Sequence, residues 1–320
     1  MKTISGADLV AHLDVLSLVD ALAVAFRSKI SAPLRQHYAM PRHGEPDAVL
    51  LTMPAWSDMS AGKGDDPVIG VKLVTLVPGN SARNIGTVLG SYMLMSGVTG
   101  EPLAVIDGTT LTHLRTAAAS ALAARYLART DASRLVMVGA GAMAPHLIRA
   151  HAAIRPIRDV AIWARDVTKA EALAATLTGT AFRISVVTDL DAAIADADIV
   201  SAATMSPTPL IHGRFLKEGA HVDLVGSYTP AMRESDNDTV RRARIFVDTI
   251  EGATHEAGDI VQPLKTHVIK TGDIEGDLFG LTAGRVTGRL HGNEITLFKA
   301  VGTALEDLAA ARLAYNRVRG

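Results

Sequence analysis

The feature that most constrains this chain is a short apolar run leading directly into a glycine-rich turn. Residues 134–138 read Arg-Leu-Val-Met-Val and continue as Gly139-Ala140-Gly141-Ala142-Met143-Ala144. The apolar run predicts a buried strand, and residues 142–152 predict a helix. Gly139 permits a tight turn, Gly141 lets a ligand approach the backbone, and Ala144 keeps the helix close to the strand. Because a helix N-terminus presents N–H groups to phosphates, the pattern predicts a dinucleotide-binding turn; a tight βα turn without a ligand is the alternative.

The segments around this turn alternate between strand-like and helix-like patterns. Further helices are expected over 110–129 and 168–177, and strands over 159–163, 183–187, 199–203, 221–225 and 245–247. Alternation at this spacing is typical of a parallel, doubly wound sheet. The sequence therefore predicts an α/β protein with a Rossmann domain.

The N-terminal part of the chain has a different texture. Ser5 and Ser17 can each cap a short helix, and β-rich runs follow at 48–53, 68–77, 88–95 and 103–106. These runs predict a second sheet in an α+β domain. At the other end, the pattern of Glu294–Arg317 predicts one long amphipathic helix.

Composition excludes several functions. Lys and Arg number 32 and Asp and Glu 33, so the net charge of −1 gives no attraction for nucleic acid or an anionic membrane, and we expect neither as a partner. The chain has no cysteine, and its 11 histidines form no metal-binding motif, so we expect no metal. We also expect no signal peptide, no membrane-spanning segment and a cytoplasmic location.

The end of the second strand of the alternating unit bears on the choice of dinucleotide. NAD-binding domains usually place a carboxylate at this strand end to bind the ribose 2′-hydroxyl, but here Ala164 is followed by Arg165. A guanidinium suits a 2′-phosphate, so NADPH is the predicted cofactor, with NADH as a second possibility. The alternative is that Arg165 is solvated and Asp166 binds the ribose.

Two cations outside the glycine turn are candidates for substrate binding. Lys72 lies in an otherwise apolar strand, where a buried ammonium needs a partner, although an alternating strand could also point it to water. Arg115 precedes a run of small residues and could bind a carboxylate, although a solvated helix arginine has the same pattern.

Several segments, taken in order along the chain, together resemble the ornithine cyclodeaminase/μ-crystallin family. Besides the glycine turn, the matching segments are Gly70-Val71-Lys72, Pro78-Gly79-Asn80, Thr99 to Ala104, Leu111-Thr112, Arg115 to Ala118, Pro230 to Glu234, Glu256 to Asp259 and Glu294 to Gly302. An ordered set of this length is more specific than any one motif.

The resemblance implies a homodimer and a division into two domains. Residues 1–115 with 294–320 would form a substrate-binding and dimerisation domain, and residues 116–293 the Rossmann domain. Lys72, Arg115 and Arg35 would bind the substrate carboxylate and polarise the reacting centre. The residues expected to hold the cofactor are Thr116, Gly139, Ala140, Gly141, Ala142, Met143, Arg165, Thr204, Val225 and Ser227, and those expected in the substrate pocket are Tyr228, Glu256 and Lys299.

One departure from the family pattern bears on the reaction. Cyclodeaminases of the family resemble one another in a catalytic Asp at the position that Tyr228 occupies here. A neutral tyrosine, with an unperturbed pKa of about 10, is a poor base at neutral pH. The chain therefore resembles the ketimine reductases of the family, which implies reduction of Δ1-pyrroline-2-carboxylate, Δ1-piperideine-2-carboxylate or both, to L-proline and L-pipecolate. Ornithine cyclodeaminase, alanine dehydrogenase and a non-catalytic NADPH-dependent ligand-binding protein are the alternatives.

Overall fold

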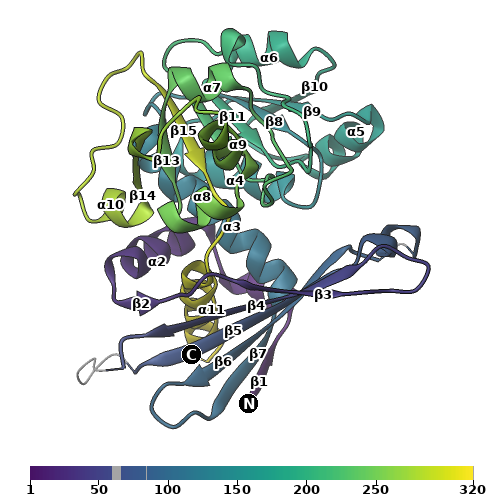
Figure 1. Ribbon diagram of the computed structural model, residues 1–320, viewed down its shortest axis with the longest axis vertical. Coiled ribbons are helices and arrows are strands. Elements are labelled where there is room, and N and C mark those ends of the chain that lie inside the picture. The colour runs from purple at the N-terminus through teal and green to yellow at the C-terminus, as the bar shows by residue number, and fades with distance from the viewer. Residues whose placement is uncertain (60–65, 84, 320) are drawn as a thin grey trace. The chain divides into compact units, whose positions relative to one another are not determined.

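Two sheets organise the chain in the computed structural model, which describes residues 1–59, 66–83 and 85–319 (Figure 1). Contacts divide the chain into an N-terminal unit, residues 1–116 with 303–320, and a central unit, residues 117–302. The helices are α1 (Gly6–His12), α2 (Val15–Arg27), α3 (Gly108–Leu127), α4 (Ala144–Ile154), α5 (Val167–Thr176), α6 (Leu190–Asp196), α7 (Asn237–Arg242), α8 (Ile250–Glu256), α9 (Gly258–Lys265), α10 (Leu278–Thr282) and α11 (Ala304–Arg319).

The N-terminal unit contains a seven-stranded sheet with the order β1-β7-β6-β5-β4-β2, in which β3 also pairs with β4. Its strands are β1 (Lys2–Ile4), β2 (Ile30–Ser31), β3 (Gln36–Met40), β4 (Ala48–Ser57), β5 (Val68–Leu76), β6 (Val88–Ser96) and β7 (Pro102–Asp107). All pairs are antiparallel except β1 with β7. Alternate residues of β5 are buried, because one face of the sheet packs on the core of the unit.

Helices α2 and α11 form that core with the sheet. Asp14 caps the N-terminus of α2, which buries an apolar face that includes Leu18 and Leu22. Helix α11 lies along β4 and β5, as Figure 1 shows. The packing at Gly70 is close: a Cβ there would lie 1.8 Å from the hydroxyl oxygen of the buried Tyr92 and 2.9 Å from Leu308 Cδ1 of α11, which favours glycine at this position.

The central unit contains an eight-stranded, fully parallel sheet with the order β10-β9-β8-β11-β12-β15-β13-β14. Its strands are β8 (Arg134–Val138), β9 (Asp159–Trp163), β10 (Arg183–Val186), β11 (Ile199–Ala202), β12 (His221–Leu224), β13 (Ala243–Val247), β14 (Ile274–Asp277) and β15 (Ile295–Lys299). The strand order reverses between β8 and β11, and such a switch point is where α/β sheets bind ligands, at the carboxyl ends of the strands. The predicted α/β class with a Rossmann domain is confirmed.

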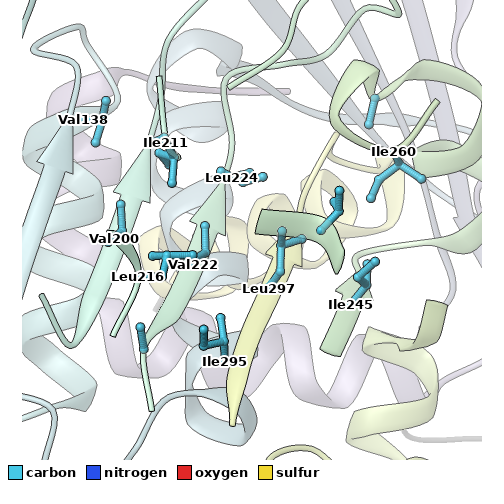
Figure 2. Packing of buried hydrophobic residues seen from close by; sticks show 14 of the residues in the cluster. Val138, Val200, Ile211, Leu216, Val222, Leu224, Ile245, Ile260, Ile295 and Leu297 are labelled. Atoms are coloured by element: carbon cyan, nitrogen blue, oxygen red, sulfur yellow. The ribbon is translucent and has the colours of Figure 1, made fainter. Parts of the chain in front are cut away.

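Helices cover both faces of this sheet. On one face, Val200, Val222 and Leu297 pack with residues of α6 to α9, such as Ile260 (Figure 2). On the other face, Asp223 of β12 accepts hydrogen bonds from Ser120 of α3 (2.9 Å) and Ser201 of β11 (2.7 Å), and it also pairs with His151 of α4. Burial on both faces explains the nearly continuous apolar sequence of β8. The polar residues of β11 and β12, Ser201 and Asp223, are buried because they hydrogen-bond to each other.

The prediction of one helix over Glu294–Arg317 is wrong in its first part. Residues 295–299 form β15, which pairs with β12 and β13, and α11 begins only at Ala304. Gly302, with φ +81°, lies between the two elements in a conformation that other residues rarely adopt. Residues 294–302 therefore group with the central unit rather than with residues 1–115.

No single helix of the described residues is long and apolar enough to cross a membrane. Helices α1 and α2, which are bent by 91° relative to each other, would together be long and apolar enough, by length and composition only. Six apolar residues of α2, among them Leu18, Leu22 and Phe26, are buried in the N-terminal unit, so its apolar composition is explained by packing in the core.

Candidate functional site

The glycine turn lies at the carboxyl end of β8, where the strand order reverses. Gly139 has φ +108°, and a Cβ there would lie 3.0 Å from the Ala203 carbonyl oxygen. Gly141 is exposed, and a Cβ on it would meet nothing within 4 Å. No side chain caps α4 at Met143. The turn thus combines an open backbone with an uncapped helix N-terminus, which is the arrangement that binds a pyrophosphate.

The end of β9 carries the two residues that compete for the ribose role. Arg165 is exposed. Asp166 instead caps α5, because its Oδ1 accepts from the Thr168 N–H at 3.1 Å and from the Thr168 hydroxyl at 2.6 Å. These hydrogen bonds lower the pKa of Asp166. One oxygen of this carboxylate, Oδ1, is thus occupied by the cap of α5.

The remaining predicted cofactor residues of the central unit follow β11 and β12. Thr204 lies two residues after β11, and Val225 and Ser227 follow β12. One buried carboxylate, that of Glu234, accepts the backbone N–H groups of Thr204 and Ser227. The structure therefore brings these two strand ends together through a residue that was not predicted for the site.

The predicted pocket residues of the central unit lie in different surroundings. The Lys299 ammonium is fully buried, 3.6 Å from Asp259 Oδ2 and 3.9 Å from Glu234 Oε2. Tyr228 is half-buried, and burial raises the pKa of its hydroxyl above 10.0. Glu256 is the last residue of α8 and is also half-buried.

Lys72 and Arg115 lie together in the N-terminal unit. Their side chains share one carboxylate: Lys72 Nζ lies 2.6 Å from Asp307 Oδ2, and Arg115 Nε donates to Asp307 Oδ1 at 2.8 Å. Arg115 Nη1 also donates to Glu306 Oε2 at 2.6 Å. Lys72 is 1% exposed and Arg115 4%, so the alternatives of a solvent-facing lysine and a solvated arginine do not hold.

The charges in this cluster change its acid–base properties. Burial is the largest cause that lowers the pKa of Lys72, to about 7; Arg115 and, more weakly, Arg35 act in the same direction, while Asp307 opposes them. Burial raises the pKa of Asp307, but Arg115 and Lys72 outweigh it, so this carboxyl titrates below its usual range. Near neutral pH, Lys72 can therefore both hold and release a proton.

Two further predicted residues, Arg35 and Thr116, belong to the same unit of the chain. Arg35 lies between β2 and β3 and is half-buried. Thr116 follows Arg115 in α3 and is 8% exposed. Within the described residues, no group of three or more His, Asp or Glu side chains is arranged to hold a metal ion.

Similarity to known proteins covers nearly the whole chain. The model of the ornithine cyclodeaminase/mu-crystallin family matches residues 3–320. The chain belongs to this family. The family resemblance drawn from the ordered motifs is therefore confirmed.

Curated relatives match over most of the chain and of their own length. Protein SAR DEFICIENT 4 of Arabidopsis thaliana is 43% identical over 90% of this chain and 87% of its own length. A Δ1-pyrroline-2-carboxylate reductase of Colwellia psychrerythraea is 35% identical over 97% of both chains. Among solved structures, the Δ1-pyrroline-2-carboxylate reductase of Thermococcus litoralis, in complex with NADH and L-proline, is 33% identical with a TM-score of 0.92, covering 100% of this chain and 98% of its own.

The sequence analysis did not identify the carboxylates that pair with Lys72 and Arg115, nor those beside Lys299. Glu306 and Asp307 lie in α11, which appeared only as an amphipathic helix. Glu234 and Asp259 lie inside segments that match the family, but neither was assigned a role. The available signal was physical: Lys72 and Lys299 both occur in apolar strands, and each buried ammonium requires a carboxylate.

Proposed function

We propose that this protein reduces cyclic ketimines with NAD(P)H, converting Δ1-pyrroline-2-carboxylate, Δ1-piperideine-2-carboxylate or both to L-proline and L-pipecolate. The observation that carries this proposal is the buried pair of cations, Lys72 and Arg115, on the shared carboxylate Asp307. The pair offers one titratable and one permanent positive charge. A cyclic imino acid needs both, since it has a basic nitrogen next to a carboxylate.

The substrate carboxylate would bind to the arginines. Two donors of Arg115, Nε and Nη1, are held by Asp307 and Glu306, so the guanidinium has a fixed orientation. Its Nη2 group and the side chain of Arg35 would meet the carboxylate. Fixing the carboxylate also fixes the adjacent C=N bond, and orientation of this kind supplies much of a rate enhancement.

Lys72 would manage the proton on the imine nitrogen. An ammonium whose pKa lies at about 7 can donate a proton near neutral pH and recover it from solvent. Thr112 Oγ1, 3.4 Å from Lys72 Nζ, and Asp307 hold the ammonium in place. Proton delivery from Lys72 to the nitrogen makes the imine carbon a better hydride acceptor.

The glycine turn fits a pyridine dinucleotide. The open space at Gly141 and the uncapped start of α4 leave room for a pyrophosphate, and Thr204, Val225 and Ser227 would hold the other half. When bound, the reduced nicotinamide supplies the hydride that the imine carbon accepts.

Tyr228 favours reduction over cyclodeamination. Loss of ammonia from ornithine needs a base at the reacting centre, and burial of Tyr228 raises its pKa, which makes it a still poorer base. Reduction of a preformed imine needs no such base.

The dinucleotide would be NADPH in preference to NADH. Arg165 is exposed at the end of β9, while the neighbouring carboxylate of Asp166 is used as a helix cap. Arg165→Ala should raise the KM for NADPH about tenfold or more and that for NADH less than about twofold, because only NADPH carries the 2′-phosphate. Equal effects on the two cofactors, in steady-state kinetics, would contradict this preference.

The active form would be a homodimer that pairs the second face of the N-terminal sheet. This face carries a row of apolar side chains that are only half-buried or exposed: Pro54, Trp56, Ile69, Val71, Leu73, Met93, Met95 and Val105. An apolar sheet face of this extent is stable when it packs on another surface, and a chain of net charge −1 does not repel its own copy.

A substrate panel tests the proposed reaction. NADPH consumption is measured with each cyclic ketimine and with pyruvate plus ammonia, and ammonia release is measured with L-ornithine and NAD. We expect turnover with the cyclic ketimines alone. Robust proline and ammonia formation from L-ornithine would identify a cyclodeaminase, amination of pyruvate would identify an alanine dehydrogenase, and tight NADPH binding without any turnover would indicate a ligand-binding protein.

A further inference from the structure

The carboxylate of Glu234 joins the ends of two strands in the central unit. Its Oε1 accepts from the Thr204 N–H at 2.6 Å and from the Thr204 hydroxyl at 2.9 Å. Its Oε2 accepts from the Gly226 N–H at 2.7 Å and from the Ser227 N–H at 3.3 Å. One side chain therefore fixes the backbone after β11 with one oxygen and the backbone after β12 with the other.

Close backbone packing leaves these two loops little freedom. A Cβ on Gly226 would lie 1.9 Å from the Thr204 carbonyl oxygen and 2.6 Å from Glu234 Oε1. The two strand ends thus touch directly, with the carboxylate beside the contact. A change at Glu234 would act on both loops together.

A second layer of buried charge holds Glu234 itself. Asp259 Oδ1 accepts the backbone N–H of Glu234 at 2.9 Å and that of Ser235 at 2.8 Å. The ammonium of Lys299 lies between the carboxylates of Asp259 and Glu234, at 3.6 and 3.9 Å. All three side chains are fully buried: Glu234, Asp259 and Lys299. Water therefore screens the attraction between their charges only weakly.

The strand order indicates which part of a dinucleotide these loops would contact. Arg165 follows β9 on one side of β8, and the two loops follow β11 and β12 on the other side. A dinucleotide on this fold spans the switch point with its pyrophosphate at the glycine turn. If Arg165 contacts the adenosine ribose, the loops at Thr204 and Gly226 face the nicotinamide half.

We infer that Glu234 is a positioning residue for the nicotinamide half of the cofactor, held in place by Asp259 and Lys299. It does not touch the reacting atoms; it sets the backbone of the loops that would do so. This inference rests on the proposed function, because it requires a pyridine dinucleotide as the cofactor.

The test compares a whole cofactor with a fragment that lacks nicotinamide. Glu234→Gln preserves the size of the side chain, but its amide NH₂ must face N–H donors, so one of the two loops loses its acceptor. By calorimetry on the purified full chain, we expect the Kd for NADPH to rise about tenfold or more. The Kd for adenosine 2′,5′-bisphosphate should change less than about twofold, because Arg165 and the glycine turn keep their structure. Glu218→Gln, the same change at an exposed residue of the central unit, is the matched control.

A general loss of structure would weaken the binding of the fragment and of NADPH equally. Either that result or an unchanged Kd for NADPH would overturn the inference. If Glu234→Gln does not fold, Thr204→Val is the second variant, because it removes one hydrogen bond to Glu234. It should raise the Kd for NADPH about threefold to tenfold and leave the Kd for the fragment unchanged. Thr204→Ser keeps the hydroxyl and should raise the Kd for NADPH less. Equal losses for Thr204→Val and Thr204→Ser would contradict the role.

The two proposals fail in different ways. A wild-type protein that binds NADPH and shows the selective loss at Glu234→Gln, but reduces no cyclic ketimine, would support the positioning role and overturn the proposed reaction. A wild-type protein that binds neither NADPH nor NADH would overturn both.

Discussion

At the scale of single residues, the chemistry depends on what surrounds Lys72. Burial and two arginines lower its pKa, and Asp307 raises it, so that the balance falls at about 7. An acid with this pKa is protonated below neutral pH and loses its proton above it. Catalysis that needs the Lys72 ammonium should therefore decline as the pH rises through about 7.

Asp307→Asn should move this decline to lower pH. The substitution removes the carboxylate that raises the pKa of Lys72 and leaves burial and Arg115 to lower it further. The pH profile of kcat/KM for the cyclic ketimine measures the shift. Asp131→Asn, at an exposed residue of the central unit, is the control and should keep the wild-type profile. A profile that moves to higher pH, or does not move, would show that Lys72 is not the titrating acid.

The sequence indicated the two cations of this cluster but not their partners. Lys72 was a candidate because an apolar strand surrounds it, yet the alternation of a strand allows either face. Its face follows from the pairing of β4, β5 and β6, which puts Lys72 opposite the buried residues Met53 and Tyr92. Asp307 reaches it only through the packing of α11 on this sheet, a long-range contact that local patterns do not contain.

At the scale of elements, the strand–turn–helix at Gly139–Ala144 was predictable because each of its residues has a local reason. Strand β15 was not predictable in the same way, because a short apolar run such as Ile295–Lys299 fits a buried strand or a helix equally well. The helix that follows it makes the whole segment look helical. The position of β15 between β12 and β13 depends on pairing with these two strands, which the sequence of residues 295–299 alone does not indicate.

The glycine turn offers a direct test of ligand approach. Gly141 has open space where a Cβ would be and no positive φ, so Gly141→Ala should change the free energy of unfolding by less than about 0.5 kcal/mol. The added methyl would occupy the space that the pyrophosphate needs, and the Kd for NADPH should rise about tenfold or more. Gly272→Ala is matched, because a Cβ there also meets nothing within 4 Å, and it should alter neither quantity. Unchanged NADPH binding in Gly141→Ala would place the phosphates elsewhere.

At the scale of the whole molecule, the apolar second face of the N-terminal sheet predicts self-association. Leu73 lies on this face and is 46% exposed in the single chain. Leu73→Glu would bury an unpaired charge in a dimer and should convert the dimer to a monomer at micromolar concentration, as measured by sedimentation. Val98→Glu, at a 69% exposed residue in the turn after β6, should leave the dimer intact. A wild-type chain that sediments as a monomer would contradict the predicted self-association.

The central claim is that a carboxylate-anchored C=N bond accepts hydride from a pyridine dinucleotide on this chain. The most direct measurement follows a deuterium from C4 of NADPH, labelled in turn on each face of the nicotinamide, into the product formed from Δ1-pyrroline-2-carboxylate. We predict that L-proline forms and that its Cα carries the deuterium from one of the two labelled cofactors and not from the other. Unlabelled proline from both cofactors, or no proline at all, would contradict the claim.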